Sequence, residues 1–323
     1  MKVRMWPLNG QVNEYIRIIL SKGKVKYTAH LWSNVLDIDF EVFHMHWPET
    51  YLNEKLFHKR ILGTLAVLVY ILFIKVIGKR IVWTVHNTKP HENRNAIISN
   101  YFYRICVLMT DEFVFMSKVS QVEFSDSYPL VKNKSYRIIY HPLYYSDSNG
   151  IDLEYNNEKF ILYFGIIRPY KNVPRLIEQF GLTSQELVLK IMGSCKDVSK
   201  EAVVSLSKGK KVQLYLERYS NKDLGLNLNS CEGVVIPYRD ITNSGVLYQA
   251  ISYGVRILIP RMKYTEEVVA SLNYRNVQFY DGEIDSNDLD SFCTNRKQIV
   301  ENFVDVESYN MNIRNAYIES YSG

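Results

Sequence analysis

The chain has 323 residues, a length that favours two domains over one. Hydrophobic residues make up 47% of it and charged residues 23%, which excludes a mainly disordered chain. Residues 1–150 carry 19 Lys and Arg against 12 Asp and Glu, a net +7, and residues 151–323 carry 20 against 22, a net −2. The basic first half favours an anionic partner such as a membrane surface or a phosphate-bearing acceptor.

Other features of the composition predict a cytoplasmic protein without a nucleic-acid partner. No two of the four cysteines have the spacing of a metal site or a redox motif, so we expect free thiols in a reducing compartment. The first seven residues lack the apolar core of a signal peptide. The net charge of +5 is modest and no nucleic-acid-binding module is recognisable.

Short apolar runs alternate with helical patterns along the chain. We expect strands at 42–46, 81–86, 113–117, 136–140, 160–165, 187–193, 212–216, 234–238, 257–260 and 277–280. This alternation predicts an α/β protein whose parallel sheets are covered by helices on both faces. Ligands of such sheets bind beyond the carboxyl ends of the strands.

The polar composition of residues 146–158 indicates a linker. We therefore predict two doubly wound, Rossmann-like domains facing across a cleft, at residues 1–145 and 159–305. Residues 306–323 are expected to form a helix that packs back toward the first domain.

One uncharged segment, Ile61–Ile74, lies between the basic residues Lys59, Arg60 and Lys75. Its 14 residues are fewer than the roughly 20 that span a bilayer. The pattern favours a helix buried in the core. The alternative is a helix lying on a membrane, with its basic flanks attracted to anionic lipid.

Polar and aromatic residues follow the expected strand at 42–46. His44 and His46 point to one face of that strand, and we expect His44 to be a core residue. Trp47 offers a flat apolar surface for a sugar ring. Glu49 can accept a proton or the hydrogen bonds of sugar hydroxyls. We predict that His46, Trp47 and Glu49 belong to a site.

A second polar group follows the strand at 81–86. His86 and Asn87 end that apolar strand, and His91 lies shortly after them. Packing alone explains such residues poorly, so we expect them in the same site. Asp37 and Asp39 form a D-x-D pattern, which is more simply a solvated strand entry than a metal site, and we expect no metal.

Two segments of the second half are suited to a diphosphate. Gly165 permits a tight turn after a strand, and Arg168 and Lys171 supply two cations beside it. A second helix start presents backbone N–H groups and a positive dipole end, as a phosphate cradle does. It consists of Thr242, Asn243, Ser244 and Gly245.

Four segments in this order resemble GT-B glycosyltransferases of the group-1, family-4-like type, closest to those of bacterial exopolysaccharide, capsule and O-antigen synthesis. They are HMHWPE, VWTVHNTKPHE, FGIIRPYKNVPRLI and TNSGVLYQAISYGVRILIP, and the resemblance covers roughly residues 40–270. It implies two facing Rossmann-like domains. The first would bind the acceptor and the second the nucleotide-sugar donor.

The resemblance also implies residue roles. Lys171 matches the phosphate-binding lysine, Arg168 and Gly165 belong to the same turn, and Ser244 and Gly245 match the residues that cradle the diphosphate. His86 or His91 matches an acceptor-side histidine.

The chain departs from the family at two glutamates. Gln249 stands where the family has the second glutamate, and there it would bind the donor ribose. The position of the first glutamate is occupied by Thr242 or Ile241, so neither glutamate is present.

The implied activity is hexosyl transfer from a nucleoside-diphosphate sugar to a polyprenyl-diphosphate-linked glycan at the inner face of the cytoplasmic membrane, without metal or cofactor. If configuration inverts, Glu49 is the candidate base. Retention, which the resemblance favours, would leave the proton to the departing phosphate, with His86 or His91 positioning sugar groups. The alternatives are a sugar-nucleotide epimerase, a phosphorylase or a non-catalytic nucleotide-binding protein.

Overall fold

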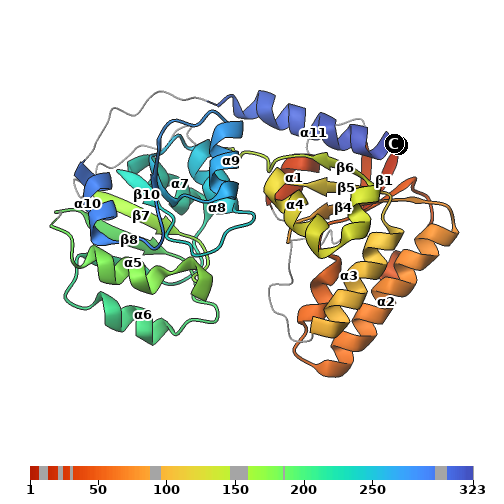
Figure 1. Ribbon diagram of the computed structural model, residues 1–323, viewed down its shortest axis with the longest axis horizontal. Coiled ribbons are helices and arrows are strands. Elements are labelled where there is room, and N and C mark those ends of the chain that lie inside the picture. The colour runs from red at the N-terminus through yellow and green to blue at the C-terminus, as the bar shows by residue number, and fades with distance from the viewer. Residues whose placement is uncertain are drawn as a thin grey trace. The chain divides into compact units, whose positions relative to one another are not determined.

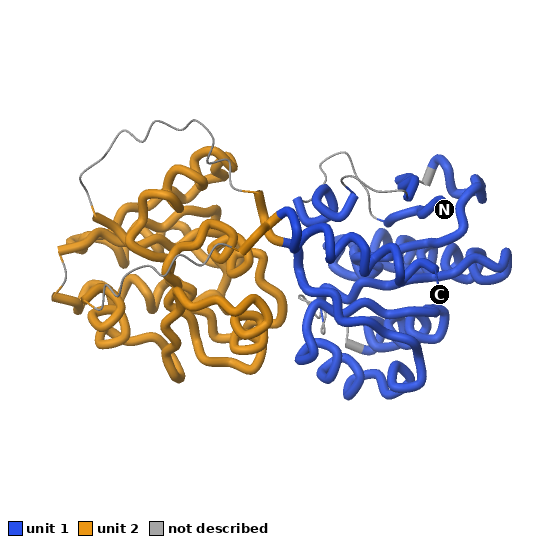
Figure 2. Tube along the Cα trace, turned by 90° about the horizontal axis from the view of Figure 1, so that it is seen from above, with its two compact units in different colours: residues 1–142, 307–323 blue, residues 143–306 orange. Residues whose placement is uncertain are grey.

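The computed structural model describes residues 1–6, 14–20, 25–29, 32–87, 96–145, 159–184, 186–294 and 304–322. The chain forms two compact units, residues 1–142 with 307–323, and residues 143–306 (Figure 2). The predicted linker at 146–158 lies outside the described residues. The first unit ends at Pro142, three residues before the expected boundary, and the amide of Tyr144 already donates to Ser252 Oγ of the second unit at 2.9 Å.

The first unit contains a six-stranded parallel sheet with the strand order β2-β1-β3-β4-β5-β6. Its strands are β1 (Lys2–Trp6), β2 (Lys26–Ala29), β3 (Val42–Met45), β4 (Arg80–Val85), β5 (Glu112–Phe115) and β6 (Ser135–Ile138). Four of them confirm the predicted strands of this half. The sequence did not predict β1 and β2, in which basic residues interrupt the apolar run. Arg4 of β1 is nevertheless fully buried, because its guanidinium pairs with Asp37 at 2.5 Å.

Two helical layers cover this sheet. The helices of the unit are α1 (Glu14–Leu20), α2 (Phe57–Val76), α3 (Ala96–Met109), α4 (Lys118–Ser127) and α11 (Val306–Ser322), with short 3-10 helices at Trp32–Asn34 (η1), Pro48–Asn53 (η2) and Pro129–Asn133 (η3). Helices α2 and α3 lie side by side (Figure 1).

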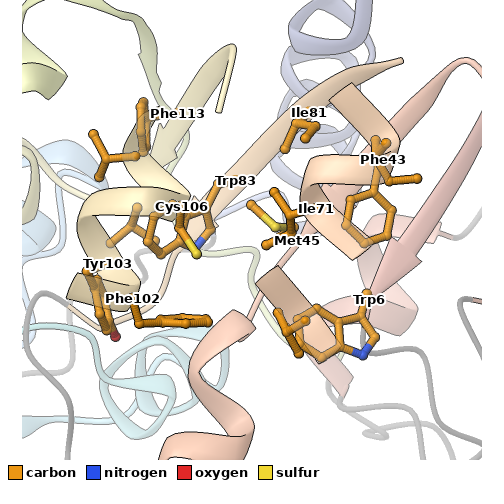
Figure 3. Packing of buried hydrophobic residues seen from close by; sticks show 14 of the residues in the cluster. Trp6, Phe43, Met45, Ile71, Ile81, Trp83, Phe102, Tyr103, Cys106 and Phe113 are labelled. Carbon is orange, nitrogen blue, oxygen red and sulfur yellow. The ribbon is translucent and has the colours of Figure 1, made fainter. Parts of the chain in front are cut away.

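The two sides of the strands enter different cores. Phe43 and Trp83 pack with Ile71 of α2 and Phe102 of α3 (Figure 3). The alternate strand residues, such as Val82, pack with residues of α1 and α11 in a second cluster. Alternation along a strand therefore places α2 and α3 on one face and α1 and α11 on the other.

The second unit contains another six-stranded parallel sheet, in the order β12-β11-β10-β7-β8-β9. Its strands confirm the six predicted for this half: β7 (Phe160–Phe164), β8 (Val188–Met192), β9 (Val212–Tyr215), β10 (Gly233–Val235), β11 (Ile257–Pro260) and β12 (Val277–Tyr280). Its helices are α5 (Val173–Phe180), α6 (Lys200–Ser207), α7 (Asn221–Ser230), α8 (Gly245–Ser252), α9 (Lys263–Ser271) and α10 (Ser286–Thr294), with a 3-10 turn, η4, at Pro169–Lys171.

Both sheets are doubly wound, as predicted, and each has a point where the strand order reverses. In the second unit this switch point lies between β7 and β10, and in the first between β1 and β3. Ligands of such folds bind at the switch point, outside the carboxyl ends of the strands. The residues that follow β3, β7 and β10 are therefore the expected ligand-binding residues.

Helix α2 contains the uncharged segment Ile61–Ile74. Its inner side is core, since Val67, Ile71 and Ile74 are buried, but Leu65 and Val69 on its outer side are exposed. The expectation of a wholly buried helix is therefore wrong for the outer side. No helix among the described residues is long and apolar enough to cross a membrane.

Candidate functional site

The turn after β7 is held by two glycines on neighbouring strands. Gly165 has φ +110° and Gly193, after β8, has φ +149°, values that side chains rarely tolerate. A Cβ on Gly193 would lie 2.0 Å from the carbonyl oxygen of Gly165. A Cβ on Gly165 would lie 3.1 Å from Val246 Cγ2 and 3.3 Å from Lys171 Nζ. The turn, the lysine and the start of α8 are thus brought together.

We expect Gly193→Ala to displace the Gly165 turn. The new methyl group would overlap the Gly165 carbonyl, and the positive φ adds strain of about 1–3 kcal/mol. Nucleotide affinity measured by calorimetry should fall more than it does for Gly209→Ala, a glycine with φ +73° and open space around it. Equal affinity in the two variants would show that the close approach does not shape the site.

Lys171 is a buried ammonium group without a paired carboxylate among the described residues. Its side chain is 8% exposed, and Nζ lies 5.0 Å from the centre of the Tyr238 ring. Burial, and secondarily the charge of Arg168, lower the pKa of Lys171 to about 8. Arg168 is half-buried and also forms no ion pair with any described residue. Because an unpaired buried charge is costly, this place is suited to a bound anion.

The start of α8 supplies further groups on the same side. Ser244 caps the helix by accepting the Leu247 N–H at 3.2 Å, and its own N–H donates to Tyr264 Oη at 3.0 Å. The helix then begins at Gly245, and a helix start leaves N–H groups without intrahelical partners. Gln249 lies one turn after Gly245, on the same face. Thr242 and Asn243 precede the cap and are half-buried.

In the first unit, the ends of β3 and β4 bring His46, Trp47 and His86 together. His46 Nδ1 and His86 Nε2 are 3.0 Å apart. The rings of Trp47 and His86 stack, with centroids 4.1 Å apart and planes 22° from parallel. One face of the indole, which the sequence suggested for a sugar, is therefore covered by an imidazole.

His44 is a core residue, as expected. Its Nδ1 lies 2.8 Å from Tyr321 Oη and its Nε2 lies 2.8 Å from Thr84 Oγ1. Sequence reasoning missed the rest of this cluster: Tyr15, whose ring lies within about 5 Å of His86 and His141, and the hydroxyls of Tyr317 and Tyr321 from α11. No local pattern signals them, since α11 follows more than 200 residues after the strands.

The buried histidines of this cluster are held neutral. Desolvation lowers the pKa of His46 to about 3 and that of His141 to about 4. It is also the main cause that brings the pKa of His44 and His86 well below the ordinary value of 6.5. At pH 7 these imidazoles are therefore neutral donors and acceptors.

We expect the first unit to unfold on mild acidification. A histidine whose folded-state pKa is depressed stabilises the fold above its unfolded pKa, and this stability is lost as the pH falls below 6.5. At pH 5 the depressed pKa values of His46 and His141 each lower the stability of the fold by about 2 kcal/mol, at about 1.36 kcal/mol per pKa unit.

Tryptophan fluorescence measures this transition, because all four tryptophans lie in residues 1–150. The second unit contains no histidine and serves as the internal control. Amide hydrogen exchange of its residues should show no loss of protection caused by histidine protonation. A fluorescence midpoint that is independent of pH between 7.5 and 5 would contradict the depressed pKa values.

Glu49 lies in η2 with its side chain 5% exposed. Asn87 Nδ2 donates a 2.9 Å hydrogen bond to Glu49 Oε1. Burial outweighs this bond and raises the pKa of Glu49 to about 7. A carboxyl group that titrates near neutral pH is suited to general acid–base work. The structure thus places Glu49 and Asn87 in contact, and Asn87 directly follows His86 in the chain.

Two further sequence predictions have different outcomes. His91 lies outside the described residues. The D-x-D carboxylates are engaged elsewhere: Asp37 pairs with Arg4, and Asp39 pairs with Lys2. Over the described ranges no group of three His, Cys, Asp or Glu side chains could hold a metal ion.

Comparisons with known proteins agree with this fold and sequence. No family profile matches the chain. The GDP-mannose:glycolipid 4-beta-D-mannosyltransferase of Xanthomonas campestris pv. campestris is 25% identical over 256 residues, which cover 76% of this chain and 69% of that protein. The structure of Anabaena HepE with UDP matches with a TM-score of 0.64 at 13% identity, covering 100% of both chains. WaaG, a glycosyltransferase involved in lipopolysaccharide biosynthesis, matches with a TM-score of 0.59 at 13% identity, covering 99% of this chain and 94% of that one. The two doubly wound units and the structural matches together show that the chain has the two-domain GT-B fold, and its sequence is similar to that of a glycosyltransferase.

Proposed function

We propose that the chain transfers a hexosyl group from a nucleoside-diphosphate sugar to a glycolipid acceptor, a polyprenyl-diphosphate-linked glycan of bacterial surface polysaccharide such as O-antigen or capsule. The observation that carries this proposal is the buried, unpaired ammonium of Lys171 beside Gly165 and the start of α8. A bound diphosphate supplies the missing counter-charge, and the similarity to a glycolipid mannosyltransferase supports the acceptor class.

The donor diphosphate becomes the leaving group of the reaction. Its negative charge grows as the glycosidic bond breaks, and preorganised donors stabilise that charge. Arg168 and Lys171 supply the cations, and the turn from Thr242 to Gly245 supplies backbone N–H groups. We propose that this set acts without a metal ion and that Gln249 binds the donor ribose. Activity that persists after chelation by EDTA is the expected result.

The linkage made by the mannosyltransferase relative bears on whether the transfer inverts or retains the configuration of the donor sugar. The mannosyltransferase relative forms a β-linkage, whereas the sugar of GDP-mannose is α-linked, so a chain that shares this reaction inverts configuration. This favours inversion over the retention that the family resemblance suggested. Inversion needs a base for the acceptor hydroxyl, and Glu49 has a pKa of about 7 for that role. His46, Trp47, His86 and Asn87 would then bind and orient the acceptor, with His91 a further candidate.

A panel of nucleotide sugars, scored by thermal shift and led by GDP-mannose, tests the donor. A ligand at 100 times its Kd raises stability by roughly 2.7 kcal/mol. Transfer of radiolabelled sugar to extracted lipid then tests the reaction. If no nucleotide sugar shifts the melting temperature, the proposed donor site is wrong.

The same panel separates the alternatives. An epimerase converts the donor without any acceptor, a phosphorylase needs inorganic phosphate, and a non-catalytic binding protein leaves a bound donor unchanged. The matched structures include a putative UDP-N-acetylglucosamine 2-epimerase of Listeria monocytogenes, with a TM-score of 0.58 at 12% identity, covering 98% of this chain and 96% of that one. A new epimer in the absence of acceptor would replace the transferase proposal.

We also propose that the protein works in the cytoplasm, at the inner face of the cytoplasmic membrane. A lipid-linked acceptor requires the acceptor-binding unit to reach the bilayer surface. The net charge of +7 on residues 1–150 supports this location.

A further inference from the structure

The outer sides of α2 and α3 carry large apolar side chains that are exposed. Six of them are 53–70% exposed: Leu62, Leu65, Val69 and Leu72 of α2, and Ile97 and Tyr101 of α3. The four on α2 are spaced three, four and three residues apart, so they form one stripe along the helix. Single exposed leucines are ordinary, but a continuous apolar surface on two helices marks an interaction site.

The two stripes face the same way. Both helices pack on the same core cluster, α2 through Ile71 and Ile74 and α3 through Phe102 and Cys106 (Figure 3). The helices are also direct neighbours in one layer (Figure 1). Their outer sides, opposite that common core, therefore form a single surface, which we call the α2/α3 face.

The charged residues of α2 and α3 themselves all have one sign. Neither α2 nor α3 contains an Asp or a Glu. Lys59 is exposed at the first turn of α2, and Arg60 next to it lies over the Phe57 ring at 5.4 Å. Arg104 is exposed on α3. An apolar surface on two helices whose own charged residues are all cationic complements lipid whose headgroups are anionic.

We propose that the α2/α3 face docks on an anionic lipid bilayer, with the exposed leucines entering the headgroup boundary and Lys59 and Arg60 contacting phosphates. This inference rests on the proposed function, because a lipid-linked acceptor needs the site to reach the bilayer. The helices lie flat on the surface, since the inner residues of α2 are committed to the core and the helix is not suited to crossing.

Docking here places the candidate base close to the lipid. The segment η2, which carries Glu49, packs directly on the first half of α2, where a Cβ on Gly63 would lie 2.3 Å from Tyr51 Cδ1. Burial, and secondarily the charge of Glu49, raise the pKa of Tyr103 and Cys106 on the inner side of α3. Glu49 thus lies close to both helices of the α2/α3 face, on their inner sides.

The charge of the α2/α3 face also argues against a second copy of the chain as its binding partner. Pairing two α2/α3 faces would bring Lys59, Arg60 and Arg104 against cations of the other copy, without any acidic residue of α2 or α3 to balance them. Phospholipid headgroups such as phosphatidylglycerol supply the opposite charge.

Co-sedimentation of the full chain with phosphatidylglycerol vesicles tests the proposal, with phosphatidylcholine vesicles as the neutral comparison. Wild type should bind the anionic vesicles and release them as salt rises from about 0.05 M to about 0.5 M. Leu65→Gln with Leu72→Gln should weaken binding at least tenfold, because two leucines lose apolar burial. Lys59→Gln with Arg60→Gln should weaken it about thirtyfold.

Matched variants outside the face are the controls. Leu182→Gln removes a leucine of the second unit that is more exposed than Leu65 or Leu72, and Lys208→Gln with Lys211→Gln removes two exposed lysines there. These variants should bind vesicles as wild type does. Nucleotide-sugar protection in thermal shift should be unchanged in every variant, so a failure of docking is distinguished from a failure of the proposed function.

Two results would overturn the docking proposal. One is wild-type protein that ignores anionic vesicles at low salt. The other is a dimer in sedimentation equilibrium that Leu65→Gln with Leu72→Gln converts to a monomer while vesicle binding is unchanged. The latter would assign the α2/α3 face to self-association.

Discussion

Glu49→Gln lowers turnover by about 10²–10⁴-fold while the fold remains intact. The substitution keeps the shape of the side chain and its contact with Asn87 but removes the group that accepts a proton. In the wild type the rate should rise with pH through about 7, where the Glu49 carboxyl loses its proton, and level off above. Initial rates from pH 5.5 to 8.5 measure both effects.

The same substitution should stabilise the protein at pH 8. The pKa of Glu49 is about 7 in the folded state and ordinarily 4.5, so the folded state retains a proton that the unfolded state releases between these values. Stability therefore falls as the pH rises from about 4.5 to about 7, and Gln removes this loss. Tryptophan fluorescence in denaturant gives the free energy of unfolding.

Glu54→Gln is the matched control, since it changes an exposed glutamate just after η2. It should leave rate and stability close to wild type. Near-normal activity of Glu49→Gln would remove the base role, and product NMR would then be expected to show a retained configuration.

Lys171→Met weakens nucleotide-sugar binding by about 10–150-fold. The change keeps most of the apolar stem but removes the buried charge, and a hydrogen bond to a charged group contributes about 1.5–3 kcal/mol. Calorimetry with GDP-mannose and GDP measures the loss. Because both ligands carry the diphosphate, the two affinities should fall together.

The unliganded Lys171→Met protein should be more stable than wild type below pH 8. The folded-state pKa of Lys171 is about 8 against an ordinary 10.5, so the charged lysine opposes folding at lower pH. Lys190→Met, another buried lysine, whose Nζ lies 3.8 Å from the centre of the Phe160 ring, is the control. It should not change nucleotide affinity. Unaltered affinity in Lys171→Met would refute the diphosphate site.

The sequence by itself determined the fold class and ten of the twelve strands. Buried parallel strands are continuous apolar runs, and such runs are visible without any knowledge of tertiary contacts. Gly165, Lys171 and Ser244 were predictable for a related reason. A turn that follows a strand and a helix start that follows a strand place their polar groups at the same edge of a parallel sheet.

Only the tertiary structure decided which groups meet and how their protonation changes. The tyrosines of α11 reach His44 from the far end of the chain, and Gly193 supports Gly165 across neighbouring strands, so neither contact has a local signal. The pKa values of Glu49 and Lys171 depend on burial, which no single residue type encodes.

In the segment Ile61–Ile74, too, the tertiary structure decides which residues are buried. Its sequence is apolar all round, and which side of α2 faces the core depends on where α3 and the sheet pack against it. Packing buries Ile71 and leaves Leu65 exposed, although both are large aliphatic residues. The difference arises because a helix in a surface layer can turn only one side toward the sheet, and the chain does not specify that side by hydrophobicity alone.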